Sequence, residues 1–353
     1  MDRYIGLDGH SQSCTLRVLT ATGKDVGREV VETNGAALVQ AVRAIPGSKH
    51  LCLEEGVQSS WLYELLRDEV DEIVVTMPVR RVGSKDDARD ALELAEGLRT
   101  GAIKRRVYKP CGPYSELRAA VRSYTMLTRD VVRAKARLKA LYRSRAILAP
   151  GDEVYQASKH EQWEKKLPPP QRESAGLLYE QVEALTKLWS SAEERLLEAS
   201  KAHKIVKILS TAPAIGPIRS AQIVATVVTP HRFRTSRQFW AYCGLAIVTR
   251  SSSDWIPGPQ GWVRSKTCQT RGLNRNRQPM LKAVFKGAAH QVAVQMKSHA
   301  LHESYKRLID EGGVKPNLAE LTIARRIASA VLAMWKHGEV YDPAKHRSNI
   351  TQA

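Results

Sequence analysis

The stretch YIGLDGHSQSCTLRVLTATGKDVGREVVET, residues 4–33, contains three short apolar runs separated by polar turns. Each run is rich in aliphatic and β-branched residues, which is typical of strands, and Thr22-Gly23-Lys24 is expected to form a tight turn. The chain is therefore expected to begin with three sequential strands. The predicted strands are YIGLD (4–8), SCTLRVLTATG (13–23) and GREVVET (27–33).

Helices and strands alternate in the next part of the sequence. Asn34 is a suitable cap for a helix through AALVQAVRAI, and a strand, a helix and a strand are predicted after it. These three segments are KHLCLEEG (49–56), SSWLYELLRDEV (59–70) and DEIVVTMP (71–78). With the acidic helix that follows, the order β-β-β-α-β-α-β-α is that of an RNase H-like α/β fold, although other α/β folds begin in the same way.

The middle of the chain is predicted to be helical. Apolar residues recur with a 4-3 spacing in two runs, of which the first is interrupted by Thr128 and Lys135. Residues 149–171 contain Pro150-Gly151 and three consecutive prolines, so they are predicted to connect the runs. The two helices are expected either to form an antiparallel hairpin or to pair between chains. The apolar positions are Val121, Tyr124, Val131, Leu138 and Tyr142, then Leu178, Val182, Leu185, Trp189, Ala192 and Leu196.

The last part of the chain has a third character. ILSTAPAIGPIRSAQIVATV (208–227) places a Pro-x-Ile-Gly turn between two helical stretches, which predicts a helix-hairpin-helix whose amides would approach a phosphate backbone. FWAYCGL and the hydroxyl cluster TRSSSD (249–254) follow. LTIARRIASAVLAMWKHG (321–338) is predicted to close the chain as an amphipathic helix.

The composition excludes several classes of protein. A chain of 353 residues, 43% hydrophobic and 26% charged, is expected to fold into more than one domain. No apolar run approaches the roughly 20 residues that cross a bilayer, and no signal peptide is evident, so a cytoplasmic location is expected. The five cysteines are scattered and the ten histidines show no ligand spacing, so buried thiols and ordinary histidines are expected rather than disulfides or a zinc site.

The charge of the chain is unevenly distributed. Residues 1–100 contain 17 acidic and 12 basic residues, whereas the whole chain has a formal net charge of +19. From Trp255 to His302 there is no Asp or Glu. A strongly basic region indicates a polyanionic partner, because each neutralised phosphate releases counterions. Nucleic acid is favoured over an acidic membrane surface, since no basic amphipathic helix next to an anchor is present.

Acidic residues stand out against this background at four positions. Asp8 ends the first predicted strand, and Glu54 ends the fourth after an apolar run. Asp87 and Asp90 are three residues apart in GSKDDARDALELAEGL (83–98), so on a helix they share one face with Leu94. Carboxylates that point inward are costly unless a positive charge lies between them.

These four carboxylates could converge on hard divalent cations, for which oxygen ligands are the natural choice. Mg²⁺ held in this way is a standard device for phosphoryl transfer on DNA or RNA. The competing interpretation is that an acidic helix of this kind is a solvated face, as Asp86, Glu93 and Glu96 are expected to be. Asp8 and Glu54 at strand ends favour the metal site.

The motifs LDGH, LEEGVQSSWLYELL, KDDARDA, APAIGPIRSAQ and FWAYCGL, followed by a serine cluster, occur in this order. In this order they resemble the DEDD transposases of bacterial insertion sequences, in the insertion-sequence one-ten family that includes the pilin-inversion recombinases. The resemblance covers residues 1–340. It implies a RuvC-like domain (1–108), a helical coiled-coil region for RNA binding and oligomerisation (109–203), a mainly α transposase domain (204–345) and a tail (346–353).

The resemblance also implies the residues of the site. The four family acids fall on Asp8, Glu54, Asp87 and Asp90 and bind Mg²⁺. The nucleophilic serine, counted from the motif of Tyr242, Gly244 and Leu245, falls on Ser252. Because Ile247 and Ser253 replace the Pro and Gly usual in the family, the choice among Ser251, Ser252 and Ser253 stays open.

The implied activity is RNA-guided strand exchange through a covalent 5′-phosphoserine intermediate. The implied partners are donor and target DNA, a structured bridge RNA and further copies of the chain in a dimer or tetramer, on the nucleoid and without a membrane. Two alternatives remain: a metal-dependent nuclease or junction resolvase that uses water, and a non-catalytic nucleic-acid-binding derivative. The residues expected to contact nucleic acid are Arg122, Arg129, Arg133, Arg137, Arg219, Arg264, Lys266, Arg271, Arg275, Arg277 and Lys282.

Overall fold

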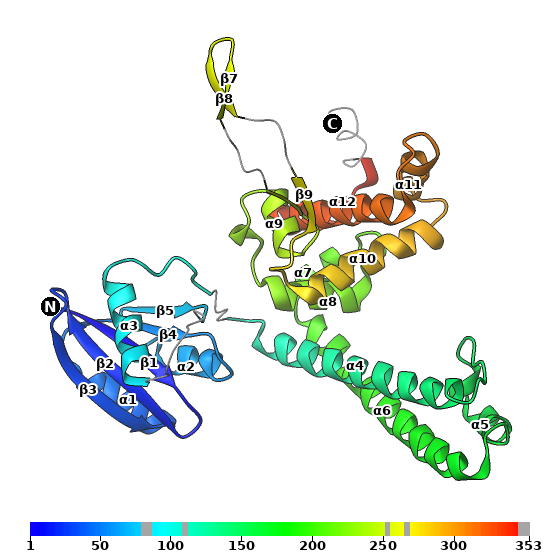
Figure 1. Ribbon diagram of the computed structural model, residues 1–353, viewed down its shortest axis with the longest axis horizontal. Helices are drawn as coiled ribbons and strands as arrows, with labels where there is room; N and C mark the ends of the chain where they lie inside the picture. Colours follow the sequence, from blue (N-terminus) through cyan, green and yellow to red (C-terminus); the bar gives the residue numbers. More distant parts are fainter. Residues whose placement is uncertain (79–86, 108–111, 251–254, 265–268, 345–353) are drawn as a thin grey trace. The chain divides into compact units, whose positions relative to one another are not determined.

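The chain folds into two compact units, Met1–Gly112 and Pro113–Ala353 (Figure 1). The computed structural model describes residues 1–78, 87–107, 112–250, 255–264 and 269–344. Among these residues, no helix is both long and apolar enough to span a membrane.

The first unit is built on a five-stranded sheet with the strand order β3-β2-β1-β4-β5. The first three strands are antiparallel, and β1, β4 and β5 run parallel. The predicted order of three strands followed by alternating helices and strands is confirmed. The elements are β1 (Asp2–Gly9), β2 (Ser13–Thr20), β3 (Asp25–Glu32), α1 (Gly35–Ala44), β4 (Ser48–Glu54), α2 (Ser59–Leu66), β5 (Glu72–Thr76) and α3 (Asp87–Arg99).

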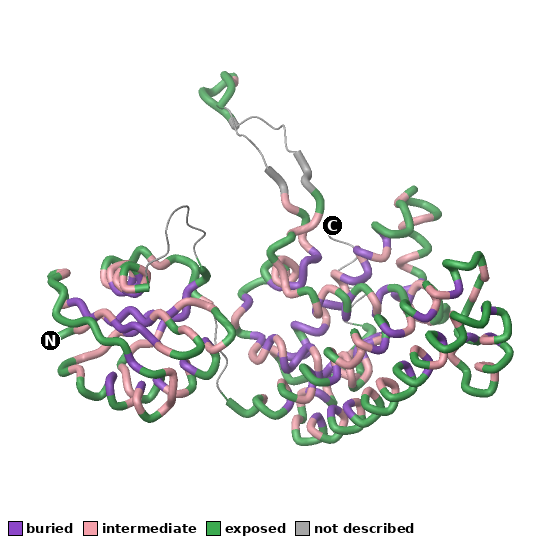
Figure 2. The backbone as a smooth tube through the Cα atoms, turned by 60° about the horizontal axis from the view of Figure 1, so that its bottom comes forward, coloured by how far each residue is buried: buried purple, intermediate pink, exposed green. Residues whose placement is uncertain are grey.

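Helices cover both faces of this sheet, and the buried residues are drawn along its centre in Figure 2. One face packs against α1 and α2, whose Leu38, Val42 and Leu62 join Ile5 and Leu7 of β1 in one core. The other face packs against α3 through a smaller cluster of Cys52, Val74, Leu94 and Leu98. The predicted cap is also present, because Asn34 Oδ1 accepts a hydrogen bond of 2.8 Å from the Ala37 amide.

Gly6 of β1 is the point where α3 approaches the sheet most closely. A Cβ at this position would lie 2.8 Å from the backbone nitrogen of Ala95 and nearer still to the carbonyl oxygen of Ala91. Since side chains alternate along a strand, Gly6 and Asp8 are on the same face of β1, the one that faces α3. The missing side chain at Gly6 therefore lets the helix lie against the strand that carries Asp8.

The second unit begins with a long helical hairpin of α4 (Ser115–Arg143) and α6 (Pro169–Lys201). The helices are antiparallel: the Trp189 indole donates to Thr128 Oγ1 at 3.0 Å, and the Tyr142 and Tyr179 hydroxyls lie 2.7 Å apart toward the other end. Of the two arrangements predicted, the structure therefore has the pairing within one chain.

The predicted connection between these helices is partly wrong. Helix α6 begins at Pro169, so Pro169 and Pro170 form its first turn instead of preceding it. A first turn tolerates proline because its amides have no partner within the helix. The connection also contains the short helices η1 (Glu153–Tyr155), η2 (Ala157–Lys159) and α5 (His160–Glu164), which cover a small core around Trp163.

The remaining helices pack around α12, and the base of the α4–α6 hairpin shares their core. The last helix is longer and more buried than the predicted amphipathic helix, because most of its circumference is covered. Two short two-stranded sheets complete the unit. The elements are α7 (Lys204–Leu209), α8 (Gly216–Val227), η3 (Pro230–Arg232), α9 (Ser236–Tyr242), β6 (Ile247–Arg250), β7 (Trp255–Gly258), β8 (Gly261–Arg264), β9 (Gln269–Leu273), α10 (Pro279–Val294), α11 (Ala300–Asp310) and α12 (Pro316–His337).

Candidate metal centre and nucleic-acid interface

Asp8 and Glu54 lie at the carboxyl ends of neighbouring parallel strands. The register pairs Gly6 with Cys52 and Leu7 with Leu53, so its continuation places Asp8 level with Glu54. Both residues line one pocket of about 540 Å³ at this edge of the sheet. Two acids that are 46 positions apart in the sequence are therefore brought to one place by the parallel pairing of β1 and β4.

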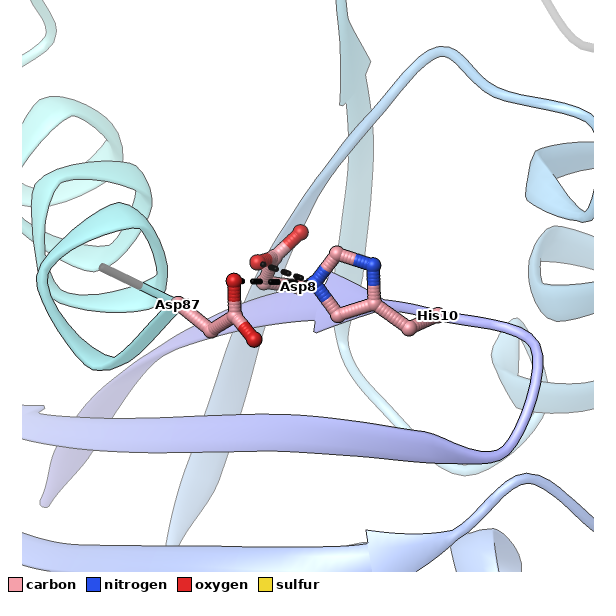
Figure 3. A group of neighbouring side chains, drawn as sticks. All are labelled: Asp8, His10 and Asp87. Carbon is pink, nitrogen blue, oxygen red and sulfur yellow. Dashed lines mark hydrogen bonds and ion pairs between the residues drawn. The ribbon is translucent and has the colours of Figure 1, made fainter. Parts of the chain in front are cut away.

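Helix α3 adds a third carboxylate to this site (Figure 3). His10 Nε2 lies 3.1 Å from Asp8 Oδ2 and 3.1 Å from Asp87 Oδ1. One ligand atom from each of these three residues falls within 4.8 Å of the others. The side chain of Asp8 is only 14% exposed, whereas that of Asp87 is 49% exposed. The site is thus anchored at its base and open to solvent on the α3 side.

The spacing of residues on α3 explains why Asp87 reaches Asp8. Four helical residues rise about 6 Å, which is close to the roughly 6.6 Å between alternate residues of a strand. Ala91 of α3 packs on Gly6 of β1. The residue one helical turn before Ala91 therefore comes level with the residue two positions after Gly6 on the strand. These residues are Asp87 and Asp8.

Asp90 is also in the first turn of α3 and is half-buried, four residues before the buried Leu94. It is outside the group of three ligand atoms formed by Asp8, His10 and Asp87. The structure therefore brings Asp8 and Asp87 into direct proximity, places Glu54 on the same pocket, and leaves Asp90 beside the cluster.

Cys52 of β4 is buried and lies two residues before Glu54. The pKa of the Cys52 thiol is raised to about 12, mainly by burial and also by the negative charge of Glu54, while the charge of Arg106 acts in the opposite direction. Cys14, Cys52 and Cys243 are buried free thiols, as predicted, while Cys111 and Cys268 lie outside the described residues.

The donor set fits a divalent cation. Carboxylate oxygens are the ligands that hard cations prefer, and two of them converge here with an imidazole nitrogen between them. The His10 imidazole lies between the Asp8 and Asp87 carboxylates, at the position where a positive charge would offset their mutual repulsion. Asp8, Asp87 and His10 could hold such a cation directly, with Glu54 on the same pocket.

His10 is the site residue that sequence reasoning missed, because it was expected to be an ordinary histidine. A single histidine has no ligand spacing, so no metal-ligand motif marks His10 in the sequence. The available signal was its position two residues after Asp8, which puts both side chains on the same side of an extended segment.

The predicted nucleophile and its neighbours, Ser251, Ser252 and Ser253, lie outside the described residues. Strand β6, which leads to them, is held in place by two backbone hydrogen bonds just before it. The backbone N–H of Asn274 donates to the Ala246 carbonyl at 3.0 Å, and the backbone N–H of Gln278 donates to the Tyr242 carbonyl at 2.8 Å. Gly244 adopts a φ of 70°, and a side chain there would collide with Arg277. The loop before α10 and the turn before β6 therefore form one fixed support.

The predicted nucleic-acid contacts fall into two groups. Arg122, Arg129, Arg133 and Arg137 are all exposed on α4, whereas Arg219 is half-buried and donates to Gln291 Oε1 at 2.8 Å and to the Ala214 carbonyl. Of the C-terminal group, Arg275 is exposed, and Lys266 lies outside the described residues. Only the backbone positions of Arg264 and Arg271, in β8 and β9, are described.

Arg277 and Lys282 are close enough to repel each other. The pKa of the Lys282 ammonium is lowered mainly by burial, and also by the charges of Arg277 and Lys286. Arg277 Nε is buried and has no hydrogen-bond partner among the described residues. Cations gathered beside the loop that precedes α10 favour an anionic ligand.

Comparison with known families identifies the class of protein. Residues 206–306 match a family model described as "Transposase IS116/IS110/IS902 family", and residues 5–144 match the DEDD transposase model of the IS110 group, described as "Transposase". The first unit with its four acids and the region around the serine cluster are thus both transposase domains. A search of curated proteins finds no match.

The protein is a DNA transposase, and its substrates are DNA. The chain belongs to the IS110 family of insertion-sequence transposases, since two of that family's models match it and together span more than half of it. The DEDD class and the cluster of Asp8, His10 and Asp87 together indicate dependence on a divalent metal.

Proposed function

We propose that the protein is a two-site recombinase that exchanges DNA strands through a phosphoserine intermediate. The first unit would be an RNase H-like, RuvC-like metal domain, and the second would carry the nucleophile Ser252. The observation that carries this proposal is the convergence of Asp8 and Asp87 on His10, with Glu54 on the same pocket. The strand order 3-2-1-4-5, with parallel pairing of β1, β4 and β5, supports the RNase H-like assignment.

The metal in this proposal is Mg²⁺, held by Asp8, Glu54, Asp87 and Asp90. When bound, it would stabilise charge on the reacting phosphate and lower the pKa of a hydroxyl there. The carboxylates would hold the cation, and the Asp8 side chain, which is only 14% exposed, would be the less solvated ligand of the Asp8–Asp87 pair. His10 would keep Asp8 and Asp87 together and offer a nitrogen donor.

The chemical step belongs to Ser252. Its Oγ attacks the phosphorus of a phosphodiester, a P–Oγ bond forms, and the P–O3′ bond breaks, leaving a 5′-phosphoserine ester and a free 3′-hydroxyl. The serine proton is removed during attack, and the departing 3′ oxygen is protonated. A serine hydroxyl is a weak nucleophile at its own pKa and needs this assistance. The metal domain of another protomer in a dimer or tetramer would supply it.

The α4–α6 hairpin, as a coiled coil, would hold a structured bridge RNA and contribute to assembly. Arg122, Arg129, Arg133 and Arg137 lie 7, 4 and 4 residues apart and are exposed, which gives α4 a row of guanidinium groups. Such a row suits the phosphates of an RNA backbone. The proposal divides the chain into a metal domain (1–108), a helical RNA-binding region (109–203) and a transposase domain (204–345). It also places the protein in the cytoplasm, on the nucleoid.

The test is a denaturing gel of protein mixed with guide RNA, donor DNA and target DNA. Wild-type protein is expected to form a protein–DNA adduct that survives denaturation, and Ser252→Ala is expected to abolish it while Ser251→Ala and Ser253→Ala retain it. Loss of the adduct in only one of the neighbours would move the nucleophile to that residue. Cleavage without any adduct would establish the rival metal-dependent nuclease that uses water, and absence of metal-dependent activity would favour a non-catalytic binding protein.

A further inference from the structure

The hairpin of β7 and β8 exposes an unusual amount of apolar surface. Trp255 is 57% exposed, Trp262 67%, Ile256 46% and Val263 45%, all within strands of four residues each. Figure 2 shows the hairpin as exposed over nearly its whole length. A two-stranded hairpin is marginally stable by itself in water, and large exposed apolar side chains favour a binding role.

The register sorts these side chains onto two faces. Trp262 pairs with Pro257, which is two residues from Trp255, so the two indoles share a face. Ile256 pairs directly with Val263 on the opposite face. The hairpin is therefore a thin ribbon with two large aromatic rings on one side and two aliphatic side chains on the other.

The charge around the hairpin favours a nucleic acid as the occupant. Trp255 is the first residue of the segment to His302 that contains no Asp or Glu, while this segment contains Arg264, Lys266, Arg271 and three further basic residues before Lys286. A second copy of this face would meet like charge, whereas a nucleic acid offers phosphates to the cations and flat bases to the indoles.

The distance along the chain sets where the bases would be. Trp255 follows Ser252 by three residues, which span at most about 11 Å when fully extended. Successive phosphates on one DNA strand are about 3.4 Å apart along the axis, so the start of the hairpin lies within about three nucleotides of a phosphate attacked by Ser252.

We propose that the β7–β8 hairpin binds unpaired DNA bases beside the attacked phosphate by stacking them on Trp262 and Trp255. This inference rests on the proposed function, because strand exchange must separate the bases that flank the cut before they pair with a new strand. The hairpin would hold those bases during the interval. Indole stacking tolerates any base, so the hairpin would add affinity for unpaired DNA without adding sequence preference.

The test uses full-length protein carrying Ser252→Ala, so that binding is measured without reaction. A duplex with a central mismatched bubble is compared with the fully paired duplex by fluorescence anisotropy. Trp262→Ala is expected to weaken bubble binding by between about 5-fold and about 150-fold, the effect of losing one base–aromatic stack. Binding of the paired duplex should be unchanged. Trp262→Phe should retain most of the bubble affinity, and Ile256→Ser is the matched control on the opposite face.

Equal losses on the bubble and on the paired duplex would overturn the proposal, as would unchanged bubble binding. A change of oligomeric state in Trp262→Ala, measured by light scattering, with unchanged bubble affinity would assign the hairpin to a protein contact instead. The adduct gel with Ser252 intact separates the two proposals: its failure refutes the phosphoserine mechanism, while the bubble measurement alone decides whether the hairpin binds unpaired bases.

Discussion

Replacing Gly6 by Ala would test how the metal site is assembled. The new methyl group would lie 2.8 Å from the Ala95 nitrogen and closer to the Ala91 oxygen, both in the backbone of α3. Backbone atoms have no rotamer that removes the clash, so α3 must withdraw from β1 by on the order of 1 Å. Asp87 would withdraw with it, because it is on the same helix one turn before Ala91.

The expected magnitude has two parts. Overpacking of this kind costs about 1–3 kcal/mol of stability. A displacement of about 1 Å in a group that positions the reaction lowers the rate by about 100-fold. The assay is the rate of adduct formation, with urea unfolding to confirm that the protein is folded at the assay temperature.

Gly27→Ala is the matched control for this substitution. Gly27 is in β3 of the same sheet, and a Cβ there meets nothing within 4 Å. Its adduct formation and stability should match those of the wild type. If Gly6→Ala formed adduct at the wild-type rate, the close packing of α3 on β1 would not be what positions Asp87, and the reasoning would be refuted.

Three further predictions concern other parts of the molecule. His10→Ala should weaken binding of Mn²⁺ more than binding of Mg²⁺ in calorimetric titrations, because an imidazole nitrogen adds little for Mg²⁺, which prefers oxygen ligands. His50→Ala is the control. Equal losses of affinity for both metals would contradict the role of His10 as a nitrogen donor. Arg129→Ala should lower the slope of log K against log salt for RNA by about 0.7 to 0.9, whereas Lys187→Ala on α6 should leave it unchanged. The unfolding free energy should fall as pH rises from 9.0 toward 12, since the Cys52 thiol then ionises only in the unfolded chain. About 1.4 kcal/mol per pH unit of this decline should disappear in Cys52→Ala. Identical slopes of unfolding free energy against pH in the two proteins would contradict the raised pKa.

The order of elements in the first unit was predictable because its strands alternate or are continuously apolar and its turns are marked by Gly and Asn. The strand-end positions of Asp8 and Glu54 followed from the same pattern. Their convergence was also predicted, but it depended on the RNase H-like layout and the family resemblance, because a strand pattern alone does not specify that β1 pairs with β4.

The helical hairpin of α4 and α6 shows another limit of prediction from the sequence. Thr128 and Lys135 interrupt the apolar pattern of α4, yet Thr128 accepts a hydrogen bond from the Trp189 indole and the Lys135 ammonium lies 4.8 Å from the centre of the Tyr155 ring. Polar residues at such positions are satisfied by partners distant in the sequence. Likewise, Pro169 was predicted to precede a helix that it begins, because the same proline suits a loop and a first turn.

The most direct test of the account is binding of Mn²⁺, as a spectroscopic stand-in for the divalent metal, to full-length protein followed by electron paramagnetic resonance. Wild-type protein and Asp68→Ala, which alters an exposed acid of the same unit, should bind with the same affinity. Asp8→Ala and Asp87→Ala should each weaken binding by at least about 10-fold, since each removes an oxygen donor from the cluster. Undiminished binding in both variants would show that the carboxylates meeting at His10 do not form the metal site.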